Sequence, residues 1–358
     1  MKLKLKNTAE QIELVKAMGS RDNLVAAEAN QAFAAFLGPV VAKVLMQAAT
    51  ASAIYTDLPY DEDDRPSIPL DLWFDGGEGY TTTWSQSVAG GLPTSTVEGF
   101  SEMKVATYRL DSAVSFLKRY ARRGRLDVVS KAVERMANEL LIKQERNAWA
   151  VALKTLAESG NVLNTDETTV VFTLDILNRL MTQVKRINRS FAGGTTTDAY
   201  GLTDLFVSPE VKEDIRSFAY QPVSITTTAD TLPAKNVLTN LPDAVREDIY
   251  RNAGTQEIYG VAIHDLIELG GNQKYNFLFK EFYSGTFEPV TDEVIVGLDL
   301  TKDAFVRPVA RQAESGGTFT ALPDDQFAAR SEKIGFYGFL EEGRVCVDAR
   351  AVHGVVIR

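Results

Sequence analysis

The sequence predicts an α+β fold, because helical and strand-like stretches are interspersed along the whole chain. The chain has 358 residues and 45% of them are hydrophobic, which is enough to bury a sizeable core. One long amphipathic helix in the first half and a strand-rich stretch over residues 328–357 are its clearest local patterns. The length predicts two or three lobes, or one elaborate domain.

Two helices are expected near the start of the chain. The first begins at Thr8, which forms a capping-box pattern with Gln11, and ends at Gly19. The second is rich in alanine and runs from about residue 22 to residue 52, with a break at Gly38-Pro39. Few large apolar residues occur per turn, so we expect this segment to be an arm and not the centre of a core.

The Ala-rich stretch over residues 32–54 comes closest to a membrane span. Gly38-Pro39 breaks it and Lys43 and Gln47 interrupt it, which favours an arm packed on a partner subunit over a span. Residues 1–6 are too short and too polar for a signal peptide. We therefore expect no membrane partner.

A linker and a ribbon follow. Residues 57–69 contain three prolines and a run of four carboxylates, Asp61, Glu62, Asp63 and Asp64. Strands are then expected at 67–74, 80–88 and 103–110, with a Gly-Pro tip at 90–93. A ribbon with so few apolar residues is marginal alone, so it indicates a neighbouring chain.

The long helix is expected over Leu126–Glu158, and Gly160 ends it. At about 1.5 Å per residue it spans roughly 50 Å, which suits an extended subunit. The elements expected after it are a helix at 173–188, a strand at 205–207, a helix opened by Ser208-Pro209, a loop at 219–245, short strands and turns from 249 to 305, and strands over 328–357.

Signatures of catalysis and cofactor binding are missing from the sequence. His264 and His353 have no second His or Cys at metal-ligand spacing, and Cys346 is alone and fits a small buried hydrophobe. The sequence has no nucleophile elbow, phosphate-binding loop or dinucleotide fingerprint. We expect no catalytic residue, cofactor or metal, with an enzyme carrying an unrecognised site as the alternative from another class.

A basic run over Lys118–Arg125 is the sharpest charge feature, in a chain whose formal net charge is -10. It contains Arg119, Arg122, Arg123 and Arg125 with Tyr120 between them, as nucleic-acid binders do. The sequence offers no second basic region to form a groove, so salt bridges to an acidic neighbour are favoured.

Three stretches resemble the major capsid proteins of tailed bacteriophages. They are Gly201–Ser217, Val245–Phe277 and Ser331–His353. That family has the Hong Kong phage capsid fold, which encapsulins and the floor of herpesvirus capsids share. The order of these stretches, after an arm, an extended loop and a long helix, extends the resemblance to nearly the whole chain.

The resemblance implies a tailed-phage major capsid fold with four parts. Residues 1–65 would be an N-terminal arm and residues 66–112 an extended β-ribbon loop. Residues 113–172 and 323–358 would form the peripheral domain with its long spine helix, and residues 173–322 the axial domain around five-fold and six-fold axes.

The implied function is that of a structural head protein. It would form pentamers and hexamers of an icosahedral shell that encloses double-stranded DNA without sequence-specific binding. Scaffold, portal and cement or decoration proteins are the implied partners. The implied location is the host cytoplasm during assembly and the virion afterwards. An encapsulin-type cargo compartment is the alternative within the fold.

Both charge runs would lie at the subunit periphery in that layout. We therefore predict that the run Asp61, Glu62, Asp63 and Asp64 pairs, at least partly between subunits, with Arg119, Arg122, Arg123 and Arg125.

Overall fold

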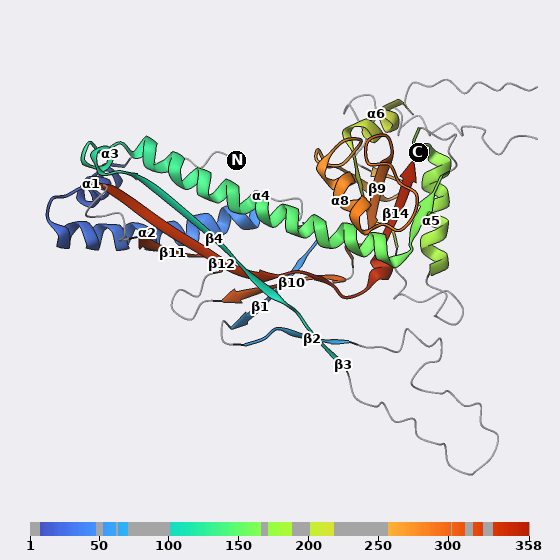
Figure 1. Ribbon diagram of the computed structural model, residues 1–358, viewed down its shortest axis with the longest axis horizontal. Coiled ribbons are helices and arrows are strands. Elements are labelled where there is room, and N and C mark those ends of the chain that lie inside the picture. The colour runs from blue at the N-terminus through green and yellow to red at the C-terminus, as the bar shows by residue number, and fades with distance from the viewer. Residues whose placement is uncertain are drawn as a thin grey trace, which may run out of the picture. The chain divides into compact units, whose positions relative to one another are not determined.

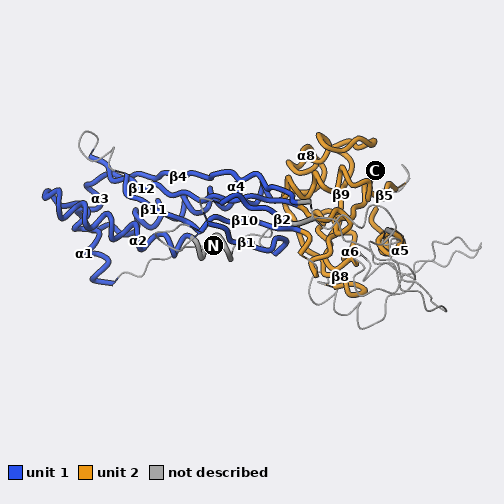
Figure 2. Tube along the Cα trace, turned by 90° about the horizontal axis from the view of Figure 1, so that it is seen from below, with its two compact units in different colours: residues 1–69, 102–148, 305–345 blue, residues 70–101, 149–304, 346–358 orange. Residues whose placement is uncertain are grey.

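The computed structural model describes most of the chain as two compact units (Figures 1 and 2). The described residues are 8–47, 53–61, 64–70, 101–165, 171–187, 201–217, 257–301, 303–311, 318–324 and 332–357. Unit 1 comprises 1–69, 102–148 and 305–345, and unit 2 comprises 70–101, 149–304 and 346–358. Helices and strands alternate in both, which confirms the predicted α+β class.

Unit 1 is built on a sheet whose central strand is β12 (Lys333–Gly343). On one side β12 pairs antiparallel with β4 (Thr107–Leu117) along its whole length. On the other side it pairs with β11 (Thr320–Asp324) and β10 (Phe305–Arg311). The sheet continues from β10 to the parallel strand β1 (Thr56–Asp61), and β13 (Val345–Cys346) also pairs with β10. The short strands β2 (Ser67–Leu70) and β3 (Ser101–Lys104) form a separate ladder.

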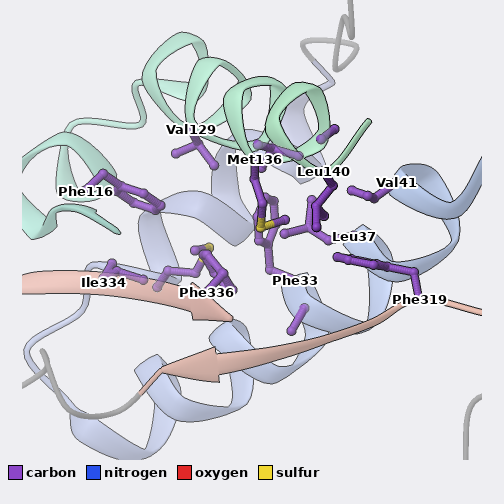
Figure 3. Close-up of a cluster of buried hydrophobic side chains, with 14 of the residues drawn as sticks. Phe33, Leu37, Val41, Phe116, Val129, Met136, Leu140, Phe319, Ile334 and Phe336 are labelled. Atoms are coloured by element: carbon purple, nitrogen blue, oxygen red, sulfur yellow. The ribbon is translucent and has the colours of Figure 1, made fainter. Parts of the chain in front are cut away.

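Helices pack on one face of this sheet and form a single hydrophobic cluster with it (Figure 3). They are α1 (Ala9–Met18), α2 (Asn23–Gln47), α3 (Lys118–Arg122) and the first part of α4 (Leu126–Ser159). On β12 the alternate residues Ile334, Phe336 and Leu340 point into this cluster. Each large side chain buried in this way stabilises the fold by about 1.5–3 kcal/mol.

The long helix α4 agrees with its prediction to within one residue at the C-terminal end. Its buried residues recur every three or four positions, and the helix stops before Gly160, which has φ of 71°. The members of this stripe inside the unit 1 cluster are Leu126, Val129, Val133, Met136 and Leu140.

Two details predicted for α1 and α2 are wrong. Thr8 precedes α1 with an extended backbone, but its side chain makes no capping hydrogen bond. Helix α2 continues through Pro39, where a break was predicted. Proline removes one backbone hydrogen bond, but Phe33, Leu37 and Val41 are buried on both sides of it, and their packing holds the helix together.

The prediction that the first segment contributes little to a core is also wrong for α1 and α2. Val15, Met18, Phe33 and Leu37 belong to the hydrophobic cluster of unit 1. Residues 23–41 are long and apolar enough to cross a membrane by length and composition, with 39% of that window buried inside the protein. Phe33, Leu37 and Val41 form one face of α2 that is buried in the core, whereas Leu24, Val25 and Phe36 are exposed.

Unit 2 contains a second sheet, with the strand order β5 (Val162–Asn164), β14 (Val352–Ile357), β9 (Glu293–Leu298), β6 (Asp204–Val207), β8 (Val261–Asp265) and β7 (Glu257–Ile258). β14 pairs parallel with β5 and antiparallel with β9. All six residues of β14 are buried, so this strand lies in the core of the unit. The predicted strand-rich C-terminal stretch is thus confirmed over the described residues 332–357.

The described helical segments of unit 2 are the end of α4 (residues 149–159), α5 (Leu174–Ile187), α6 (Pro209–Ser217), α8 (Lys274–Phe282) and the 3-10 turn η4 (Ala349–Ala351). The predicted start of α6 is confirmed, because the Ser208 hydroxyl accepts a hydrogen bond from the Val211 N–H at 3.2 Å.

Helix α8 was not predicted, because its aromatic-rich sequence favours strands. Its buried residues Tyr275, Asn276 and Phe279 nevertheless follow helical spacing. The Asn276 side chain donates to the Asp292 carbonyl at 2.8 Å and accepts from the Gly270 N–H at 3.3 Å. These tertiary bonds anchor the helix.

The two units divide the chain differently from the domain ranges implied by the resemblance. Residues 149–172 and 346–358 were grouped with the peripheral domain, and the structure places them in unit 2, where β5 and β14 are part of the sheet. The predicted strand at 80–88 and the tip at 90–93 lie outside the described residues. Which unit is peripheral and which is axial stays a prediction.

Candidate intersubunit contact site

The predicted arginines lie on and directly after α3, which follows β4 without a loop. Ala121 points into the core, while Arg119, Arg122, Arg123 and Arg125 are exposed. Gly124 turns the chain from α3 into α4 with φ of 63°, a conformation that favours glycine. A Cβ there would also lie only 3.0 Å from Lys16 Cε.

Contacts within the subunit orient three of these arginines. Arg122 Nε donates to the Gly19 carbonyl at 2.9 Å and so ties α3 to the end of α1. Arg119 lies over the Tyr120 ring, with its guanidinium carbon 5.1 Å from the ring centroid. Arg125 Nη2 lies 3.3 Å from Asp127 Oδ2, an exposed pair that contributes about 0.2–1 kcal/mol.

The structure adds a second basic segment that sequence reasoning missed. Packing of α1 against α3 brings exposed Lys16 to Gly124 and Gly19 to Arg122, and exposed Arg21 follows Gly19 by two residues, although these residues are about a hundred positions away from the arginines in the chain. Asp22 and Asp127 also lie in this region. We call the resulting surface the basic end of unit 1; its cations are Lys16, Arg21, Lys118, Arg119, Arg122, Arg123 and Arg125.

The acidic run lies at the end of β1. Asp61 and Asp64 are exposed, and the Asp64 N–H donates to the Asp61 carbonyl at 2.9 Å, which closes a turn. Glu62 and Asp63 lie outside the described residues. Over the described part of the chain, no ion pair joins Asp61 or Asp64 to an arginine of the basic end.

The sheet register explains why the two runs do not meet within one subunit. Asp61 pairs with Arg311 of β10. Because β10 pairs with β12 and β12 pairs with β4, Asp61 lies at about the same position along the strand direction as Leu110 of β4. From Leu110 the strand continues for seven residues to Leu117, roughly 23 Å at about 3.3 Å per residue, before α3 begins. Both views show β1 and α3 well separated in unit 1 (Figures 1 and 2).

Comparison with known proteins places this arrangement in a fold. No protein-family model and no curated protein matches the sequence. The capsid structure of the cyanophage P-SCSP1u is similar, with a TM-score of 0.55 and 13% identity, covering 86% of this chain and 88% of that one. A structure of the Microbacterium phage Oxtober96 has a TM-score of 0.50 and 11% identity, over 86% of this chain and 90% of that one. This chain has the phage capsid fold.

The resemblance seen in the sequence is thereby confirmed at the level of the fold. A virus-like particle from Pyrococcus furiosus is also similar, with a TM-score of 0.45 and 11% identity over 91% of this chain and 99% of that one. The pairing of the two charge runs between subunits stays a prediction.

In this example of the phage capsid fold, unit 1 also holds a buried network of polar side chains. The Glu342 carboxylate has no exposed surface and lies 2.9 Å from Arg307 Nε and 3.3 Å from Arg344 Nη2. It also accepts hydrogen bonds from Gln144 at 3.0 Å and from the Tyr108 hydroxyl at 2.8 Å. Burial, reinforced by the Glu342 charge, raises the pKa of Tyr108 to about 12. The network joins β4, β10, β12 and α4, which no sequence pattern indicates.

The face of the unit 1 sheet away from the helices carries a second, more exposed polar group. Arg109 Nε lies 2.8 Å from Asp111 Oδ1, and its guanidinium carbon lies 3.8 Å from the centroid of the Phe339 ring. The Tyr337 hydroxyl donates to Asp111. Leu322, on the neighbouring strand, is 47% exposed. This face therefore offers apolar and charged surface to a partner.

The histidines and the cysteine do not form a site together. His264 Nε2 lies 2.7 Å from Asp204 Oδ1 and the ring stacks on Phe206. His353 is fully buried in β14, and this burial lowers its pKa to about 4. Burial also raises the pKa of the Cys346 thiol to about 12. Among the described residues, no group of three or more His, Cys, Asp or Glu side chains is arranged to hold a metal ion.

Proposed function

We propose that this chain is a major capsid protein that assembles with copies of itself into the icosahedral head of a tailed phage. The observation that carries the proposal is the similarity to the capsid structure of the cyanophage P-SCSP1u, which covers 86% of this chain and 88% of that one. In such a shell the subunits form pentamers and hexamers and enclose double-stranded DNA without reading its sequence.

The surface of unit 1 supports a protein that works in contact with copies of itself. Over the described residues, β4 pairs only with β12, so one edge of this eleven-residue strand has no partner. Long open edges are aggregation hazards that proteins normally cover. On the opposite face from the helices, Arg109 and Leu322 are exposed and Phe339 is half-buried. Neighbouring subunits would cover both surfaces.

The proposed role is structural and not catalytic. The low pKa of buried His353 keeps its imidazole neutral and shielded, and burial holds the Cys346 thiol in its unreactive protonated form. We further propose that scaffold, portal and cement or decoration proteins are the other partners, and that assembly in the host cytoplasm precedes location in the virion.

The full chain, purified alone, tests the proposal by sedimentation velocity and negative-stain electron microscopy. We expect capsomers, tubes or closed shells. A compact monomer at every protein concentration and salt concentration would overturn the proposal. Particles purified from cells also test the alternative within the fold, because enclosed protein cargo without DNA would indicate a cargo compartment.

A further inference from the structure

We propose that the basic end of unit 1 binds the acidic turn at Asp61 and Asp64 of a second copy of this chain. The inference rests on the proposed function, because it names the contact through which copies would join. Its components are cations on α1, on α3 and in the turns that follow these two helices in one copy, and exposed carboxylates at the end of β1 and just after it in the next.

Arginine chemistry suits the basic end to carboxylate partners. A guanidinium group presents a planar fork of donors that matches two carboxylate oxygens. The contact of Arg122 with Gly19 and the stacking of Arg119 on Tyr120 hold these side chains in place, which reduces the entropy lost on binding. Lys16 and Arg21 extend the positive surface onto a second segment.

The acidic turn is exposed in the subunit and is too far from the basic end to form ion pairs with it within the same subunit. Asp64 accepts a hydrogen bond from the Arg65 N–H at 2.8 Å, which fixes its carboxylate at the surface. The turn keeps Asp64 within about 7 Å of Asp61. Roughly 23 Å of sheet separates Asp61 from α3, more than an arginine side chain can reach.

Two complementary surfaces at different places on one rigid sheet produce a directional contact. The basic end of one copy takes the acidic turn of the next, whose own basic end stays open for a third. Such head-to-tail contacts close into rings when the rotation between copies closes. Pentamers and hexamers are rings of this head-to-tail kind.

Nucleic acid is the other polyanion that this surface could bind. The formal net charge of -10 opposes the approach of the whole chain to DNA, whereas the acidic turn belongs to the same chain and occurs once per basic end. The charges therefore favour a second copy, and DNA binding becomes an outcome of the test.

The test uses two charge-reversed forms of the full chain. The first carries R119E and R123E, at exposed positions, and leaves Arg122 in place because it contacts Gly19. The second carries D61R and D64R. We expect each alone to need at least about tenfold more protein than wild type before assemblies form in sedimentation.

Mixing the two reversed forms gives the decisive measurement. In an alternating arrangement, which can close in a hexamer or extend along a tube but cannot close in a pentamer, every altered basic end meets an altered acidic turn, and every native end meets a native turn. We therefore expect the equimolar mixture to assemble near the wild-type concentration, as should one chain carrying all four changes. A mixture that assembles no better than its components overturns the proposal.

A matched control and a second variant protect the result. R135E with K143E changes the net charge of the same unit equally, at exposed positions on α4 outside the basic end, and should assemble as wild type does. Circular dichroism checks that each variant is folded. If R119E with R123E misfolds, the neutral variant R119Q with R123Q takes its place. Normal assembly of this neutral variant would then count against the proposal. Raising the salt concentration should weaken wild-type assembly.

The outcomes separate this inference from the proposed function. If wild type does not assemble at all, the proposed function fails. If wild type and both reversed forms assemble equally, only the inference fails. Should R119E with R123E assemble normally but lose binding to a fluorescent DNA duplex that wild type binds, the basic end faces nucleic acid and the inference is overturned.

Discussion

Glu342 brings together more buried charge than any other described residue of unit 1. Two arginines and two neutral donors converge on a carboxylate with no exposed surface. Buried ions are stable only when paired and hydrogen-bonded, so removing one partner leaves an uncompensated charge in the interior. The network also fixes β10 and β4 against the central strand, and its integrity decides whether the sheet of unit 1 holds its shape.

Replacing Glu342 with glutamine keeps the shape of the side chain and removes its charge. Arg307 and Arg344 then lose their buried counter-ion, and we expect the free energy of unfolding to fall by about 3 kcal/mol. Denaturant unfolding of the two proteins measures the difference. Glu158→Gln, at an exposed pair with Lys154, is the control and should lower stability by less than about 0.5 kcal/mol. Equal effects of the two changes would contradict the network's role.

His353 makes the stability of unit 2 depend on pH. Its pKa is about 4 in the folded chain, against 6.5 for a histidine in water, so on acidification the unfolded chain takes up the proton first. The stability is fully present above pH 6.5 and falls as the pH drops to about 4. The total loss is roughly 3 kcal/mol.

The variant His353→Asn tests this dependence. We expect its unfolding free energy to change less between pH 6.5 and about 4 than that of wild type. The variant keeps the buried carboxyl of Glu293, whose pKa is raised mainly by burial, so the difference between the two curves isolates His353. Parallel curves would show that the imidazole is not the titrating group.

Single elements were predictable where one local pattern decides the structure. The apolar stripe of α4 and the Ser208-Pro209 start of α6 identified those helices because both signals lie within a few residues. The unbroken course of α2 and the helical state of α8 depend on contacts with distant segments, which no local pattern contains. Their physical cause is tertiary packing that overrides local propensity.

Pro39 offers a direct test of that override in α2. Replacing it with alanine restores a backbone N–H in the middle of a helix that is already formed. Because the proline side chain is exposed, no packing is lost, and we expect unit 1 to be more stable by about 1 kcal/mol or more. Thermal unfolding measures this, with Ala35→Ser, one turn earlier on the exposed face, as a control that should be slightly destabilising. A lower melting temperature for Pro39→Ala would show that the proline fits a local distortion of α2.

At the scale of the whole molecule, the sequence predicted the fold. Of the candidate intersubunit contact site it predicted the two charge runs but not the cations that the fold adds to the basic end. The arginine run and the carboxylate run stand out in the sequence, since each is contiguous. The contribution of Lys16 and Arg21 could not be predicted, because it depends on the packing of α1 against α3. The separation of the two runs follows from a sheet register that joins residues some two hundred positions apart.

The segment between β2 and β3 is expected to serve assembly more than folding. Its sequence has too few apolar residues to form a core of its own, so replacing residues 76–93 with a short Gly-Ser linker should leave a folded subunit. Shell formation should fail, because the family resemblance gives this loop the role of overlapping the next subunit. Circular dichroism and electron microscopy measure the two effects. Loss of the folded state would instead assign these residues to the core.

The positions of β12 and β14 along the chain have a consequence for protein synthesis. Both strands lie inside their sheets, and both come after residue 332. A nascent chain that stops earlier has made the apolar stripe of α4 but neither of the strands that complete the two cores. Pairings between distant segments form slowly, and exposed apolar surface attracts chaperones and proteases in the meantime. Truncated copies would thus be degraded as unfolded chains before they could join a growing assembly and block its further growth.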